Sequence, residues 1–225
     1  MEKVNQFIDK LFNFVPGYVF GFLTFFILFL GDIIALILSP EYYMWESSIS
    51  VLGLHSGGVY LRLGLIVSGL TSIPFMIYLG RILKSENAKE YLVKITVITG
   101  IFYSICATCT GIFTGVNVVI DFVHGIFALF SWIGKAVFCT LLSILMLKDS
   151  RFSKLQIYLS FIVAGIFFCY LIPFFITVFC AIYASICYEL GETIYLIMPV
   201  FEWILMFSVI FWYLINSSYI AYKKI

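Results

Sequence analysis

Three ionisable side chains, Asp121, His124 and Lys135, occur within one strongly apolar stretch of this sequence. On a helix they share one stripe with Ala128 and Ser131, because the spacing is i, i+3, i+7, i+10 and i+14. Such groups could line a polar pocket, hold a metal ion or, in the case of His124, act as a base. We expect the stripe to meet other polar groups inside a helical bundle, with Asp121 and His124 at the mouth of a pocket and Lys135 at its floor.

Further candidates for the same pocket lie in other apolar stretches and in the loop after the first of them: Asp32, Ser50, His55, Arg62 and Glu202. A charge at the centre of a membrane helix costs roughly 2.5 to 3.5 kcal/mol on insertion scales, so the charged members should face inward. They could pair only with one another and orient the helices, or they could line a functional pocket. Within the pocket we expect Lys135 and Glu202 to be partners across two helices.

The two histidines raise two further chemistries. His55 and His124, with Asp121 and Glu202, have the nitrogen and oxygen ligands that zinc takes, but no H-x-x-x-H or H-E-x-x-H spacing occurs. We therefore expect no metal site and no cofactor. A serine of the segment "SSIS", residues 47–50, could also be a nucleophile with either histidine as its base, although no G-x-S-x-G elbow is present.

The composition is that of a membrane protein. Hydrophobic residues make up 63% of the chain and charged residues 11%, whereas soluble domains carry about 25% charged residues. A net charge of +1, with no basic run beyond those that flank apolar stretches, argues against nucleic acid as a partner. Four of the cysteines lie within apolar stretches, where they are typical small buried hydrophobes, whereas Cys180 and Cys187 could lie at the outer surface and pair there.

Six apolar stretches are each long enough to cross a hydrocarbon core of about 30 Å as a helix. We expect one all-α domain over residues 1–225, a polytopic bundle with transmembrane helices at about 17–38, 58–83, 93–115, 122–147, 155–178 and 194–216. Residues 1–13 place apolar side chains on one helical face, which predicts a short amphipathic helix on the membrane surface. Small residues recur at helical spacing in the third stretch, including Gly100 and Gly111, so we expect that helix to pack closely near the bundle centre.

The basic residues indicate an orientation. Arg62 and Lys135 lie well within spans, whereas every other lysine and arginine falls at the chain ends, in the second and fourth connections between spans, or within three residues of those connections. By the positive-inside rule both termini are expected to be cytoplasmic, in a multi-pass protein of the cell membrane. The ionisable residues of the spans then lie in the outer half of the membrane, with Lys135 near its midplane.

Four short motifs carry a resemblance to a known family. They are "ISVLG" at 49–53 before a glycine-rich span, "GIF" at 111–113 at the end of the third span, His124 at the start of the fourth, and "PVFEW" at 199–203 in the sixth. In this order they resemble the prokaryotic six-helix membrane family known as domain of unknown function 998 and, more distantly, the Frag/DRAM/Sfk membrane proteins linked to autophagy and glycolipid-anchor handling.

This resemblance covers nearly the whole chain. It implies a six-helix fold with Ser50, His124 and Glu202 near the functional side, and it implies no particular activity. The family commonly has an acid directly after the serine, and Val51 stands there in this sequence. Any chemistry that needs that acid is therefore not implied for this chain.

Taken together, these patterns favour an outward-facing polar pocket that binds or handles a lipid headgroup. Whether the protein is an enzyme is left open. The alternatives are a membrane-embedded lipid hydrolase, which bound zinc would favour, and a small ion-coupled or solute-coupled transporter, which an inverted repeat of the two halves would favour. The expected partner is a membrane lipid, with a second copy of the chain as a further alternative.

Overall fold

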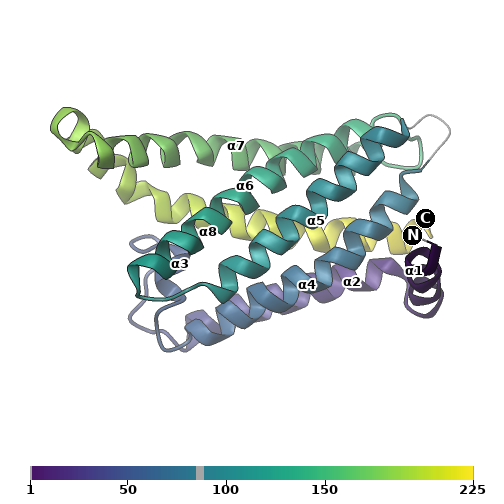
Figure 1. The fold of residues 1–225 in the computed structure, drawn as a ribbon, viewed down its shortest axis with the longest axis horizontal. Coiled ribbons are helices and arrows are strands. Elements are labelled where there is room, and N and C mark those ends of the chain that lie inside the picture. Colours follow the sequence, from purple (N-terminus) through teal and green to yellow (C-terminus); the bar gives the residue numbers. More distant parts are fainter. Residues whose placement is uncertain (1, 85–88, 225) are drawn as a thin grey trace.

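The computed structural model describes residues 2–84 and 89–224, and these residues form helices and the connections between them, with no strand (Figure 1). The helices of the described residues are α1 (Glu2–Phe14), α2 (Gly17–Ile37), α3 (Ile49–Leu52), α4 (Gly58–Ile82), α5 (Glu90–Ile112), α6 (Val118–Met146), α7 (Lys154–Ile182) and α8 (Ala184–Lys223). Among them, six are long and apolar enough to cross a membrane. The prediction of an all-α bundle with six such helices is confirmed.

The six long helices form a closed ring in chain order. Each of α2, α4, α5, α6, α7 and α8 packs against the next, and α8 returns to pack against α2. The expectation that the third long helix, α5, lies at the bundle centre is therefore wrong, because α5 is one wall of the ring between α4 and α6. Its glycines do allow close packing: a Cβ on Gly111 would lie 2.9 Å from the carbonyl oxygen of Arg62 in α4.

Large aromatic side chains fill part of the space inside the ring. Trp212 of α8 is fully buried, and its ring meets Phe75 of α4 at 6.1 Å and Phe138 of α6 at 5.7 Å between centroids, both edge to face. Such aromatic contacts add to the area that these residues bury. They hold opposite walls of the ring together.

The amphipathic helix α1 lies at the end of the ring that carries both termini (Figure 1). Asp9 forms an ion pair of 2.6 Å with Arg81 at the end of α4, and the Arg81 guanidinium lies 5.2 Å from the ring centre of Phe12. Phe7 and Phe14 stay exposed. This arrangement suits a helix that lies at a membrane surface with apolar side chains turned toward lipid.

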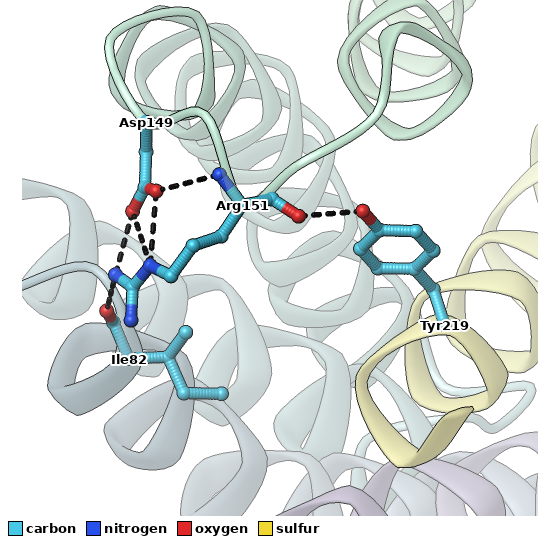
Figure 2. A network of polar contacts seen from close by, with 4 residues as sticks. All are labelled: Ile82, Asp149, Arg151 and Tyr219. Carbon is cyan, nitrogen blue, oxygen red and sulfur yellow. Dashed lines mark hydrogen bonds and ion pairs between the residues drawn. The ribbon is translucent and has the colours of Figure 1, made fainter. Parts of the chain in front are cut away.

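A polar cluster closes this same end and is named here the terminal clasp: Ile82, Asp149, Arg151 and Tyr219 (Figure 2). Arg151 donates to the Asp149 carboxylate from Nε at 2.9 Å and from Nη2 at 2.6 Å. Nη2 also donates to the carbonyl of Ile82 at 2.6 Å, and the Tyr219 hydroxyl donates to the carbonyl of Arg151 at 2.6 Å. The clasp joins the end of α4, the connection from α6 to α7, and α8.

At the opposite end, the long connection from α2 to α4 folds back over the ring and carries α3 (Figure 1). Gly57 allows its close approach, because a Cβ there would overlap the carbonyl group of Ala35 in α2. At this end of the ring, α7 and α8 extend beyond the other helices (Figure 1). Cys180 and Cys187 border a hollow between these two helices and are free thiols.

The last two helices differ from the expected spans at the end where they extend beyond the other helices. The expected 155–178 continues to Ile182 in α7, and the expected 194–216 begins at Ala184 in α8, which bends at Cys187 (φ −138°, ψ 29°). Hydropathy marks only the part of a helix that suits hydrocarbon, whereas backbone hydrogen bonding continues through the polar residues beyond it.

Candidate functional site

A cavity of about 140 Å³ lies inside the ring, lined by residues of every helix from α2 to α8. Most of its wall is apolar. The polar side chains on it that bear on chemistry are Ser50, Ser131, His124, Lys135 and Glu202. A largely apolar hollow with a few convergent polar groups is the usual form of a small-molecule site.

Ser50 and His124 meet at this cavity. The Ser50 hydroxyl lies 3.0 Å from Nε2 of His124, and Nδ1 of the same ring lies 2.9 Å from the carbonyl oxygen of Thr110. A carbonyl oxygen can only accept, so Nδ1 carries the ring hydrogen and donates it. In the neutral imidazole Nε2 is then the acceptor, and the Ser50 hydroxyl donates to it.

The end of α5 explains why the Thr110 carbonyl is free to hold the imidazole. The helix ends at Ile112, so Thr110 belongs to its last turn, where carbonyl oxygens have no partner within the helix. The Thr114 hydroxyl also donates to this carbonyl, at 2.9 Å.

Glu202 of α8 holds the short helix that carries Ser50. Its carboxylate accepts a hydrogen bond from the backbone N–H of Ile49 at 2.9 Å and another from the Tyr170 hydroxyl at 2.9 Å. Ile49 is the first residue of α3, whose first N–H groups have no partner within the helix. The residue next to Ser50 is thus fixed to two of the long helices.

Tyr42 braces the same loop from the other side. Its hydroxyl accepts from Nε1 of Trp203 at 3.0 Å and donates to the carbonyl of Ser47 at 2.7 Å, with Ser48 at 3.0 Å as a second acceptor. Burial raises the pKa of Tyr42 to about 12, so the hydroxyl keeps its proton and remains a donor at neutral pH. Neighbouring residues of α8, Glu202 and Trp203, therefore position the loop on both sides of Ser48.

Lys135 of α6 lies on the inner part of the cavity wall and is 1% exposed. Its ammonium group is surrounded by aromatic rings, with Nζ 3.8 Å from the ring centre of Trp212 and 4.7 Å from those of Tyr103 and Tyr213. Cation–π contacts of this kind stabilise a desolvated cation. Nζ also donates one hydrogen bond, to the Tyr103 hydroxyl at 3.3 Å.

The expected partnership of Lys135 with Glu202 is wrong. Neither forms an ion pair with any residue that the structure describes. Glu202 instead accepts hydrogen bonds from the Ile49 N–H and the Tyr170 hydroxyl, and the Lys135 ammonium lies against aromatic rings. The two opposite charges share one cavity without meeting in it.

The remaining sequence candidates lie outside the cavity wall. Asp121 is exposed in the first turn of α6, and Arg62 is partly buried near the start of α4. His55 packs its ring edge to face against Tyr42, with 5.7 Å between centroids. Asp32 is completely buried, and neither of its carboxylate oxygens has a hydrogen-bond partner among the described residues.

Several residues that build the site were absent from the sequence candidates. Thr110 contributes a backbone carbonyl, for which a sequence carries no side-chain signal. Tyr170 and Trp203 lie in apolar stretches, where hydropathy does not distinguish them from other apolar residues, although each has a polar atom that needs a partner when buried. The position of Trp203 directly after Glu202 was the one local signal available.

In the part of the chain that the structure describes, no three His, Cys, Asp or Glu side chains come together as metal ligands. Comparisons with known proteins found no matching family model, no matching curated protein and no matching solved structure.

Proposed function

We propose that this protein binds the phosphate-bearing headgroup of a membrane lipid in the ring cavity. The observation that carries the proposal is Lys135, a cation on the cavity wall that has no carboxylate partner among the described residues. An ammonium group has three donors, and the structure gives one of them to Tyr103. Two donors are therefore left for an anionic ligand.

The size of the cavity supports a headgroup. Its volume of about 140 Å³ is close to that of an engineered cavity of about 150 Å³ that binds benzene, so it holds a group of a few heavy atoms. Acyl chains would then remain in the surrounding lipid, beside exposed apolar faces of the long helices.

We also propose that the cavity belongs to the outer half of the cell membrane, with both termini in the cytoplasm. Arg81 is in the last turn of α4, and Lys148 and Arg151 are in the connection from α6 to α7. Figure 1 shows that these parts of the chain lie at the end that carries the termini, opposite α3. The positive-inside rule assigns this basic end to the cytoplasm.

Mass spectrometry of lipid that remains with the purified protein in mild detergent tests the binding proposal. Wild type is expected to retain about one phospholipid per chain, and Lys135→Met is expected to lose it. Lys148→Met is the matched control, because Lys148 follows the same helix and is exposed. Equal retention by Lys135→Met, or displacement of the lipid by inorganic phosphate alone, would contradict a headgroup site.

The orientation has its own test. In a cysteine-free variant, single cysteines at Glu46 and Glu189 are expected to react with a membrane-impermeant thiol reagent on intact cells. A cysteine at Ser150, in the connection from α6 to α7, is expected to react only after permeabilisation. Reaction at Ser150 on intact cells would reverse the orientation.

A further inference from the structure

Ser50, His124 and Thr110 come from α3, α6 and α5, and they form one line of hydrogen bonds at the cavity. A buried serine and histidine could simply satisfy each other. Here, however, the tautomer is fixed by the Thr110 carbonyl, so that the hydroxyl proton of Ser50 points at an imidazole nitrogen without a hydrogen. That is the arrangement in which a histidine activates a hydroxyl nucleophile.

Both members of the pair are held from outside the pair. The imidazole is fixed by the end of α5, and α3 is fixed by Glu202 through the Ile49 N–H. Positioned nucleophiles need such support, because an error of about 1 Å in geometry can cost about 100-fold in rate.

We propose that Ser50 is a nucleophile and His124 its general base, and that they act on a carboxylic ester of the lipid bound in the cavity. This inference rests on the proposed lipid-binding function. Ser50 is the catalytic residue that bonds to the substrate, His124 is the residue that moves the proton, and Glu202 is a positioning residue.

The reaction has two balanced steps. The Ser50 oxygen bonds to the ester carbonyl carbon while its proton passes to Nε2 of His124; the bond from that carbon to the alcohol oxygen breaks, and the alcohol takes the proton from Nε2. Water or a second alcohol then attacks the acyl group on Ser50, giving its proton to Nε2, and the Ser50 oxygen recovers the proton as it leaves. The products are a free fatty acid or a new ester, and the enzyme is restored.

The polar groups at the two ends of the cavity indicate the substrate class. His124 and Lys135 are eleven residues apart on α6, an axial rise of about 16 Å. The Lys135 ammonium contacts the rings of Tyr103 and Phe138, and Phe138 follows Lys135 by about one helical turn. Ser50 and Lys135 therefore lie at separate ends of the cavity, which suits a lipid with a carboxylic ester and a separate anionic group, as in a phospholipid.

The first experiment is labelling with a fluorophosphonate probe, which forms a covalent adduct with an activated serine. The purified wild type in detergent is expected to gain one adduct at Ser50, located by peptide mass spectrometry. Ser50→Ala should gain none, and His124→Gln should react at least about 100-fold more slowly, as expected for loss of a general base. Ser48→Ala, two residues earlier in the same loop, is the matched control and should be labelled like wild type.

The second experiment measures release of oleic acid from dioleoyl phosphatidylglycerol in mixed micelles. Ser50→Ala should retain lipid and release no fatty acid, whereas Lys135→Met should lose lipid and still react with fluorophosphonate. Wild type that retains lipid but neither reacts nor releases or transfers an acyl group would overturn this inference and leave the binding proposal standing. Labelling at Ser50 without lipid retention would instead overturn the binding proposal.

A structural role for the pair makes a different prediction. If Ser50→Ala and His124→Gln lowered the melting temperature but left labelling and fatty-acid release at the wild-type rate per folded protein, the hydrogen bond would serve packing alone and the inference would fail. Glu202→Gln should slow labelling while Ser50 itself is unchanged, which separates positioning from chemistry.

Discussion

The two ends of the ring handle their buried charges differently. In the terminal clasp, the Asp149 carboxylate is bound by the Arg151 guanidinium, whose remaining bond goes to a backbone carbonyl (Figure 2). In the half that contains the cavity, Lys135 and Asp32 are buried, and neither forms an ion pair with any described residue. Asp32 also has no hydrogen-bond partner there.

This difference distinguishes buried charged side chains that stabilise the fold from buried charged side chains that oppose folding. A buried charge without a partner opposes folding, and proteins keep such groups mainly where function needs them. The clasp can be explained by the connections that it makes between α4, α8 and the loop before α7. Lys135 cannot be explained in that way, because an apolar side chain would fill the same space.

The largest loss of stability is expected when a methyl group is added beside the cavity, where α4 packs against α5. Gly69 of α4 lines the cavity and packs against α5, where an added Cβ would overlap the Thr108 hydroxyl and lie 2.9 Å from the carbonyl oxygen of Ser104. Because a backbone carbonyl cannot move aside cheaply, Gly69→Ala should lower stability by about 2 to 3 kcal/mol. Thermal unfolding in detergent measures the loss, and lipid retention should fall with it.

Gly125→Ala is the control for this substitution. Gly125 is on α6, and no atom lies within 4 Å of the position its Cβ would take. Alanine is favoured over glycine inside a helix by about 1 kcal/mol, so this variant should be more stable than wild type. A Gly69→Ala protein that melts like Gly125→Ala would mean that α4 and α5 are not in close contact.

The sequence predicts the long helices well because lipid constrains them strongly. A membrane span is a helix of about 20 residues that forms its backbone hydrogen bonds internally and presents apolar side chains to the hydrocarbon. Length and apolar composition are therefore enough to locate it. The stripe on α6 was also readable, since helical spacing places His124, Ala128, Ser131 and Lys135 together, and all four line the cavity. Asp121 follows the same spacing but lies nearer the helix start, where the side chain reaches the exterior.

Which polar groups meet could not be predicted in the same way. The expected partnership of Lys135 and Glu202 relied on opposite charge and on a difference in depth that the long lysine side chain could cover, and both criteria ignore where α3 lies. The loop brings the Ile49 N–H to Glu202, and the closing of the ring brings Trp212 to Lys135. Both contacts depend on how the ring closes, which no local pattern in the sequence specifies.

A smaller loss of stability is expected when the loop is released from α8. Glu202→Ala removes the acceptor of the Ile49 N–H and of the Tyr170 hydroxyl, leaving two donors without partners. Each such group costs about 1 to 3 kcal/mol when buried, and relaxation of the loop will recover part, so we expect a loss of about 2 kcal/mol. Hydrogen exchange should rise at residues 49–53.

Glu192→Ala is the matched control, because Glu192 is an exposed residue of the same helix. It should change stability by less than about 0.5 kcal/mol. If hydrogen exchange at residues 49–53 stayed at the wild-type rate in Glu202→Ala, the loop would not depend on this carboxylate.

An increase in stability is expected when Lys135, the cation without an ion-pair partner among the described residues, is replaced. Lys135→Met keeps most of the side-chain volume inside the cage of Trp212, Tyr103 and Tyr213 while it removes a buried charge. Replacing buried charged groups by apolar ones of similar size is often neutral or stabilising, and we expect the lipid-free protein to gain about 1 kcal/mol. Melting temperatures of delipidated protein measure it. A loss of stability above about 2 kcal/mol would mean that Lys135 stabilises the fold, and the two ends of the ring would then not differ in this respect.

A change of similar size, here a loss of stability, is expected in the terminal clasp, and it should depend on pH. The hydrogen bond from Arg151 holds the pKa of Asp149 below its usual range. A carboxyl group whose pKa is lower in the folded state stabilises that state above its unfolded pKa, about 3.9, and the contribution disappears as pH falls through the folded value. Asp149→Asn should therefore lower stability at pH 7 by about 1 kcal/mol, because Arg151 is partly exposed and solvent screens the pair.

The difference between wild type and Asp149→Asn should stay constant from about pH 7 to pH 5 and shrink below about pH 4, where the wild-type carboxyl group takes up its proton. Melting temperatures of both proteins across this range measure it, with Asp121→Asn as the exposed control that should differ from wild type by less than about 0.5 kcal/mol throughout. A difference that instead grew on acidification would show that the carboxylate opposes folding. The terminal clasp would then resemble the cavity half, since both would contain a buried charge that the fold only tolerates.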